Sequence, residues 1–212
     1  GGVVAPFFSA VSVLFALPTG FVANDAWERN RQATRAVQAE RDGLLALHDL
    51  SLATVSDMAS IRAAIRVYVE AVITDEWPRQ REGEASPRAM AALSRLSAEL
   101  ATPRISVEAG LASHEALLSL WQKVRSARSD RLSLSESGSD HPKWWTVLIL
   151  AVLTQTGLAL VHLDRTGAQI TVLVLFSLAA WVTLGLVAIR ERPFDGPLAQ
   201  PPSALREALA VM

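Results

Sequence analysis

The chain has 212 residues, a formal net charge of −1 and no cysteine. The balanced charge gives no electrostatic reason to bind nucleic acid, and the cysteine count excludes disulfides, thiolate metal sites and cysteine nucleophiles. Half of the residues are hydrophobic, but the charge is unevenly distributed, because most of it lies between Asp25 and Lys143.

The first uncharged stretch covers residues 2–23, "GVVAPFFSAVSVLFALPTGFVA", and two more follow at 144–161 and 166–189. At ~1.5 Å per helical residue, about 20 residues cross the ~30 Å hydrocarbon layer of a membrane, and each stretch is close to that length. Buried core helices of a soluble protein are also apolar, but the polar segment between these stretches is too small to require so much apolar core. The pattern therefore predicts an all-α integral membrane protein with three transmembrane helices in this chain.

The polar segment that follows the first stretch is expected to be helical. In "IRAAIRVYVEAVITDEWP" (61–78), apolar residues recur at three- and four-residue steps, as on one face of a helix. Ser56 and Asp57 are suitable caps for this helix, and Pro78 is expected to end it. The next helix is expected to have Ser86 as its cap and Pro87 as its first residue, and to bury Leu93, Leu96 and Leu100.

A third helix is expected from about residue 106, with the apolar residues Leu111, Leu117, Leu118, Trp121 and Val124. Residues 133–140, "SLSESGSD", predict a polar loop before the second uncharged stretch. Since no part of the chain alternates with period two, we expect no sheet.

A basic cluster falls within the third helix, with four cations in nine residues: Lys123, Arg125, Arg128 and Arg131. One interpretation is that these are cytoplasmic charges near anionic lipid headgroups, each contributing about 1 kcal/mol. The other is a positively charged vestibule that concentrates anions. Both interpretations stay open at the level of the sequence.

The second and third uncharged stretches are joined by "HLDRTGAQ" (162–169), which is short enough for a helical hairpin. Lys143, Trp144 and Trp145 stand directly before the second stretch and are predicted to anchor it at the membrane interface. Within the hairpin, Gln155 is the most polar residue at mid-membrane depth, and hydrogen bonding between helices is its expected role.

Arginine and lysine give the orientation. They gather after the first stretch, before the second and after the third, whereas the 162–169 turn contains only Arg165. The positive-inside rule therefore places residues 25–142 and the C-terminus in the cytoplasm. The predicted organisation is a transmembrane and candidate pore helix (1–24), a cytoplasmic helical domain (25–142), a transmembrane hairpin (143–190) and a cytoplasmic tail (191–212).

Signs of catalysis or metal binding are weak. The four histidines are scattered without metal-ligand spacing, and no Gly-rich phosphate loop or nucleophile elbow is present. Asp75 and Glu76 are adjacent carboxylates, but neighbouring side chains are expected to diverge on a helix. We therefore expect no enzyme activity, no metal and no cofactor.

Several motifs resemble one membrane protein family. The stretch "LPTGFVANDAWERNRQATRA" (17–36) resembles the bestrophin signature, in which Gly-Phe near the end of a span leads into a helix with Asp, an aromatic residue, Glu and Arg. "YVEAVITDEWP" (68–78), "RSDRLSL" (128–134) and "RPFDGPL" (192–198) resemble the uncharacterised bacterial membrane proteins named bestrophin-like. The resemblance implies a multi-pass protein of the bacterial inner membrane.

Bestrophins are pentameric anion channels with helical protomers and four membrane helices. The resemblance places their apolar neck at Val13, Leu17 and Phe21, although ordinary helix packing would explain the same pattern. Pro18 interrupts this stripe and is expected to kink the helix. Only three spans are present and the chain begins with Gly, so we expect a fourth span upstream in a longer natural chain. Pro193-Phe194 lacks the acidic run of the eukaryotic calcium clasp, so no calcium site is expected.

Two functions follow as alternatives. The first is an oligomeric, homopentameric anion channel of the chloride type, with the lipid bilayer and further copies of the chain as its partners. The second is a non-conducting accessory or scaffolding subunit of a larger membrane complex, bound to unrelated partner subunits.

Overall fold

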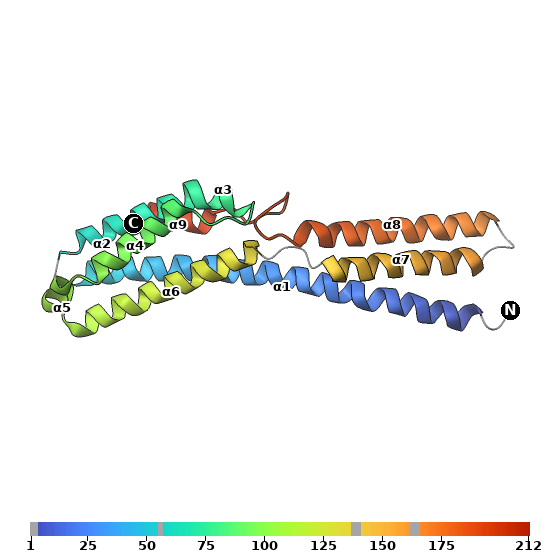
Figure 1. Ribbon diagram of the computed structural model, residues 1–212, viewed down its shortest axis with the longest axis horizontal. Helices are drawn as coiled ribbons and strands as arrows, with labels where there is room; N and C mark the ends of the chain where they lie inside the picture. Colours follow the sequence, from blue (N-terminus) through green and yellow to red (C-terminus); the bar gives the residue numbers. More distant parts are fainter. Residues whose placement is uncertain (1–3, 55–56, 137–140, 162–165) are drawn as a thin grey trace. The chain divides into compact units, whose positions relative to one another are not determined.

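The computed structural model describes residues 4–54, 57–136, 141–161 and 166–212, and within these ranges the secondary structure is entirely helical (Figure 1). The elements are α1 (Val4–Ala53), α2 (Ala59–Ala71), a π-helical turn η1 (Val72–Glu76), α3 (Trp77–Gln80), α4 (Pro87–Leu100), α5 (Pro103–Ala109), α6 (Leu111–Glu136), α7 (His141–Val161), α8 (Thr166–Arg190) and α9 (Ser203–Val211). The all-helical prediction is confirmed for these residues.

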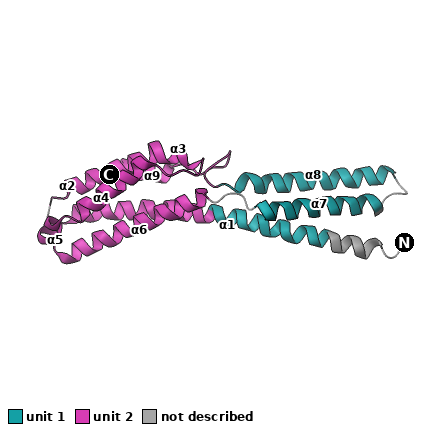
Figure 2. Ribbon diagram, viewed as in Figure 1, with its two compact units in different colours: residues 1–30, 138–192 teal, residues 31–137, 193–212 magenta. Residues whose placement is uncertain are grey.

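The chain forms two compact units (Figure 2). The first, here called the hairpin unit, contains Gly1–Asn30 and Gly138–Arg192; the second, the bundle unit, contains Arg31–Ser137 and Pro193–Met212. Helix α1 contributes residues to both, and it runs as one helix through Pro18. The bundle unit also takes in the C-terminal residues that follow Arg192.

The bundle unit is built from amphipathic helices that bury one face each. Ser86 caps α4, where its Oγ accepts a hydrogen bond from the Ala89 N–H at 3.0 Å, and Pro87 is the first helical residue. The predicted cap and start of this helix are confirmed, and so is the burial of Leu93, Leu96 and Leu100. At the start of α2, the Asp57 carboxylate accepts from the Ala59 N–H at 2.9 Å, whereas Ser56 lies outside the described residues.

Pro78 does not end the helix predicted over residues 61–78, so that prediction is wrong. The backbone widens into the π turn at Val72–Glu76 and then continues as α3, with Pro78 in its first turn. The Trp77 N–H donates to the Val72 carbonyl, five residues back, which carries the helical hydrogen bonding past the proline. A proline is tolerated in the first turn because its missing N–H is not required there.

The third predicted helix is also interrupted. α5 ends at Gly110, whose φ of 83° lies in a region that glycine enters without a Cβ clash, and α6 begins at Leu111. Leu111 is 66% exposed instead of buried, whereas Leu117 and Val124 lie in the core. The predicted loop at 133–140 starts too early, because α6 continues to Glu136; residues 137–140 lie outside the described part.

The C-terminal segment packs within the bundle unit. The Phe194 ring meets the Trp77 ring edge-on with centroids 5.7 Å apart, and the Trp77 Nε1–H donates to the Gln200 carbonyl at 3.2 Å. Leu205 and Ala208 of α9 complete the apolar core of this unit.

In the hairpin unit, α7 and α8 lie side by side (Figure 1), and both are long and apolar enough to cross a membrane. Their hydroxyl groups bond within their own helix: Thr154, for example, donates to the Leu150 carbonyl and Ser177 to the Leu173 carbonyl. Such bonds satisfy polar groups that would otherwise face an apolar environment. The Gln155 amide donates to the Ser177 hydroxyl at 2.5 Å, which confirms its predicted helix–helix hydrogen bond. Residues 162–165 of the predicted turn at 162–169 lie outside the described residues, and residues 166–169 belong to the first turn of α8.

Candidate functional site

The predicted neck residues form an uncovered apolar stripe on α1. Val13, Leu17 and Phe21 are 54%, 55% and 69% exposed, and they follow one another at four-residue steps on the same side of the helix. Leu14 beside them is also exposed. Apolar side chains that are gathered in this way and left uncovered are typical of a surface that meets a partner or a membrane.

The other side of α1 is buried against the hairpin. Val22 and Ala26 of α1 form a small core with Val147 of α7 and Val187 of α8. Near this core the Phe15 ring contacts the Phe176 ring, with centroids 5.5 Å apart. Helix α1 therefore uses one face for packing inside the hairpin unit, and the predicted neck stripe takes no part in that packing.

Polar contacts gather where α1, α7 and α8 meet near Asp25. The Lys143 ammonium pairs with the Asp25 carboxylate at 2.8 Å, and the Trp144 indole N–H donates to the Glu191 carboxylate at 2.8 Å. Of the three predicted interface anchors, only Trp145 has a largely exposed side chain without such a bond among the described residues, at 64%. Lys143 and Trp144, which were predicted as membrane anchors from their place in the sequence, thus also have bonding partners inside the protein.

The four residues of the predicted basic cluster do not form one surface. Lys123 and Arg125 are exposed, and the Arg125 guanidinium lies over the Trp121 ring at 5.6 Å from its centroid. Arg128 and Arg131 are buried in the bundle unit and are paired with carboxylates there. Only two of the four charges are therefore available to a lipid headgroup or to a dissolved anion.

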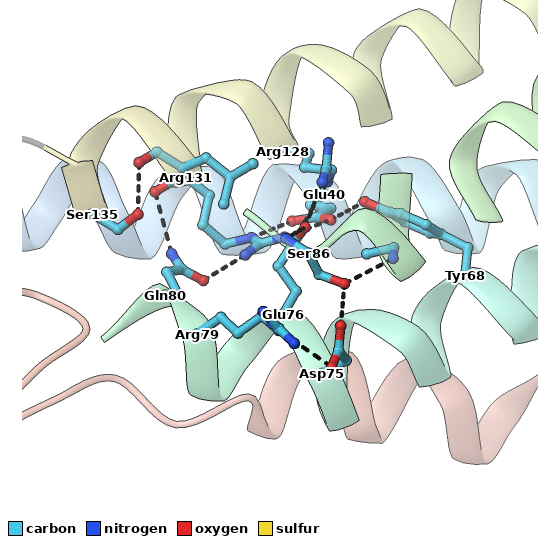
Figure 3. Close-up of polar contacts among 12 residues, drawn as sticks. Glu40, Tyr68, Asp75, Glu76, Arg79, Gln80, Ser86, Arg128, Arg131 and Ser135 are labelled. Carbon is cyan, nitrogen blue, oxygen red and sulfur yellow. Dashed lines mark hydrogen bonds and ion pairs between the residues drawn. The ribbon is translucent and has the colours of Figure 1, made fainter. Parts of the chain in front are cut away.

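Arg131 is the centre of a buried network that connects four helices of the bundle unit (Figure 3). Its Nε donates to Glu40 Oε2 at 2.7 Å, its Nη2 to Glu76 Oε1 at 2.7 Å, and its Nη1 to Gln80 Oε1 at 2.5 Å. The Trp77 ring lies 5.3 Å from the guanidinium carbon. Nearly every donor of this side chain is used, as a buried arginine requires.

Glu76 is the second centre of the network. It accepts hydrogen bonds from Arg128 as well as Arg131, and the Ser86 N–H donates to its Oε2 at 3.3 Å. Burial alone would raise the pKa of Glu76, but the hydrogen bonds and charges of the two arginines outweigh it, so the pKa lies below its ordinary value. Glu76 therefore stays ionised inside the bundle.

Tyr68 closes the network on the side of α2. Its hydroxyl donates to Glu40 Oε1 at 2.5 Å. Burial, followed by the negative charge of Glu40, raises the pKa of Tyr68 well above its ordinary value, so the phenol stays neutral. Two glutamates then balance two arginines, and the network carries no net charge.

The sequence contains a signal for this network, namely charged residues at inward positions of amphipathic helices, which sequence analysis interpreted as surface charges. Glu40 occupies an inward position of α1 between Val37 and Leu44, and Arg128 and Arg131 extend the buried face of α6 that includes Leu117 and Val124. A charged residue at a core position of an amphipathic helix calls for a partner of opposite charge. Which helices supply the partners depends on the packing of segments up to 91 residues apart.

Asp75 and Glu76 do not diverge as expected, because both reach Ser86. The Ser86 hydroxyl donates to Asp75 Oδ2, while its backbone N–H donates to Glu76. The hydrogen bond from Ser86, and then the neighbouring Arg79, lowers the pKa of Asp75. These contacts occupy the carboxylates with structural partners. Among the described residues, no group of three or more His, Asp or Glu side chains is arranged to hold a metal ion.

Comparison with known proteins identifies the architecture. The structure superposes on that of a variant of a bacterial bestrophin homolog from Klebsiella pneumoniae with a TM-score of 0.73, over 97% of this chain and 84% of that one, at 15% sequence identity. A structure of the same homolog solved by zinc phasing gives 0.72 at 15% identity with the same coverage. A variant described as a membrane protein gives 0.76 at 14% identity, again over 97% and 84%.

None of the curated proteins compared with this chain matches it. A family model, by contrast, matches almost its whole length: the Bestrophin-like domain covers residues 1–205. The predicted resemblance is confirmed, and the chain belongs to the Bestrophin-like family.

Proposed function

We propose that this chain is the protomer of an oligomeric, homopentameric anion channel of a bacterial inner membrane, in which Val13, Leu17 and Phe21 line a narrow apolar neck. The observation that supports this proposal most directly is the apolar stripe on α1. Its three side chains are more than half exposed, although the opposite face of the helix is packed. A ring of copies would bring these stripes together around one axis. The family and the shared fold support this proposal.

The chemistry of such a neck fits a gate for weakly hydrated anions. Apolar rings exclude water when they are narrow, so ions pass only when the constriction widens. α1, α7 and α8 would then be the three spans of this chain. Among the described residues, α7 and α8 are the helices that are long and apolar enough to cross a membrane. The large exposed side chains along these two helices are mostly apolar, and the exposed hydroxyls of Thr156 and Thr171 bond to carbonyls of their own helix, as contact with lipid requires.

Chloride flux into proteoliposomes tests the channel. We expect the wild-type protein to carry chloride above the level of empty vesicles, and the triple variant Val13→Ala/Leu17→Ala/Phe21→Ala to raise that flux severalfold because a wider neck holds water more easily. Leu178→Ala is a matched control, since Leu178 is an equally exposed apolar residue of α8. It should leave the flux unchanged.

Two results would oppose the proposal. If wild type and the triple variant both stay at the level of empty vesicles, the chain does not conduct. If native mass spectrometry in mild detergent finds one copy bound to unrelated chains in place of a ring of identical copies, the accessory-subunit alternative is supported instead.

A further inference from the structure

A groove of about 720 Å³ opens between α4 and α6 in the bundle unit. α4 contributes Met90, Leu93, Ser94 and Ser97, and α6 contributes residues from Trp121 to Glu136. Each set follows three- and four-residue steps, so the groove lies between one face of each helix. Its volume falls in the range of small-molecule sites, and its lining combines apolar side chains with a few polar groups, as such sites do.

One end of the groove is formed by Trp121 and Arg125. The guanidinium of Arg125 lies over the indole ring, and within the described residues this side chain has no carboxylate partner. The indole N–H of Trp121 is buried and finds no acceptor among the described residues. An aromatic surface, an unpaired cation and an unsatisfied donor thus meet at one place.

The charges along the groove limit what it accepts. Arg128 also lines it, but its charge is balanced by the ion pair with Glu76. Glu136 lies 11 residues beyond Arg125 on α6, which at ~1.5 Å per residue is roughly 16 Å along the helix. The Arg125 end therefore offers one positive charge, and the distant carboxylate opposes a second negative charge on the ligand.

We propose that this groove binds a small aromatic carboxylate, a monoanion with a flat apolar body. The exposed side chain of Arg125 rotates away from the indole ring and pairs with the ligand carboxylate. The same carboxylate accepts a hydrogen bond from the Trp121 N–H, which has no acceptor among the described residues. The aromatic body occupies the space lined by Met90 and Leu93. Ser94 and Ser129 also line the groove, and their hydroxyls can bond substituents of the ring.

Equilibrium dialysis of radiolabelled benzoate tests the proposal on the full chain in lipid nanodiscs, with empty nanodiscs to subtract partition into lipid. We expect saturable binding that benzamide, the neutral amide of the same shape, displaces poorly. Arg125→Gln should weaken the affinity by about tenfold or more, because a charge-assisted hydrogen bond is lost. Trp121→Phe, which retains an aromatic ring but removes the N–H, should weaken it less.

Arg95→Gln is the matched control, because Arg95 is an exposed arginine of α4 that does not line the groove. The affinity of the Arg95→Gln variant for benzoate should stay within about twofold of wild type. The proposal is overturned if benzoate binding does not saturate, if benzamide competes equally, or if Arg125→Gln binds like wild type. It is also overturned if Arg95→Gln weakens binding as much as Arg125→Gln does. Since binding is measured without ion flux, these outcomes are independent of whether the chain conducts.

Discussion

The two units place apolar and charged side chains in opposite ways. The bundle unit buries an extended apolar core together with two glutamates and two arginines, and it exposes most of its other charges. The hairpin unit has a small core of Val22, Ala26, Val147 and Val187, and it exposes large apolar residues along α7 and α8. In the middle of α7 and α8, the side chains of Gln155 and Ser177 join the two helices by a hydrogen bond, and both groups are uncharged.

The difference matches what water and hydrocarbon each allow a helical unit to expose. In water, apolar burial stabilises a helix bundle, and a buried charge is tolerated only where its partners are fully arranged, as around Arg131. The exposed apolar faces of α7 and α8 would be unfavourable in water but are compatible with hydrocarbon, where small cores and uncharged hydrogen bonds are sufficient. Removal of a buried, paired charge should therefore destabilise the bundle unit far more than loss of an uncharged hydrogen bond destabilises the hairpin unit.

The largest effect is expected for Arg131→Met. Methionine has a similar length but leaves the Glu40 and Glu76 carboxylates buried without their shared cation, so the free energy of unfolding should fall by about 3–5 kcal/mol. Thermal or denaturant unfolding of the full chain in mild detergent measures this change. Arg95→Met removes an exposed charge from α4 and should alter the stability by no more than about 0.5 kcal/mol. Equal losses in both variants would contradict a central role of the network.

An intermediate effect is expected on acidification. The pKa of Glu76 is lower in the folded protein than its ordinary value of 4.5, so the unfolded chain takes up a proton first as the pH falls. Its contribution to stability is complete above pH 4.5 and decreases below it, by up to about 1.4 kcal/mol per pH unit for one proton. Unfolding curves recorded between pH 7 and pH 3 measure the slope.

The matched variant for this titration is Glu76→Gln, which should be less stable at neutral pH but lose less stability on acidification. A slope identical to that of wild type would show that other carboxylates account for the acid sensitivity. Tyr68 acts at the opposite end of the pH range: because its pKa is raised, its contribution is complete below about pH 10 and is lost as the pH rises further.

The smallest effect is expected for Gln155→Leu in the hairpin. Hydrogen bonds between membrane helices contribute about 0.6 kcal/mol on average, so the variant should be only slightly less stable than wild type. Ser177→Ala removes the same bond, and a double-mutant cycle should therefore give a coupling energy of similar size. A loss comparable to that of Arg131→Met would contradict the contrast between the two units.

Local features of the bundle were predictable where one segment carries all the information. The cap at Ser86, the proline after it and the buried leucines of α4 were confirmed, because a cap and a helical stripe depend only on nearby residues. Pro78 was wrongly predicted to end a helix, and the break at Gly110 was not predicted. A π turn allowed the helix to pass the first, and the second broke a helix that its apolar pattern would have continued.

The helical class, the three uncharged stretches and the family could be predicted without the fold, since composition, periodicity and ordered motifs are properties of the linear chain. The packing of the helices was needed to establish that Arg128 and Arg131 are paired inside the bundle unit while Arg125 stays exposed. The same holds for the exposure of Val13, Leu17 and Phe21. The physical reason is that the state of a charge or an apolar side chain depends on which distant segment covers it. Residues 40, 76 and 131 meet only after α1, the π turn η1 and α6 have packed together.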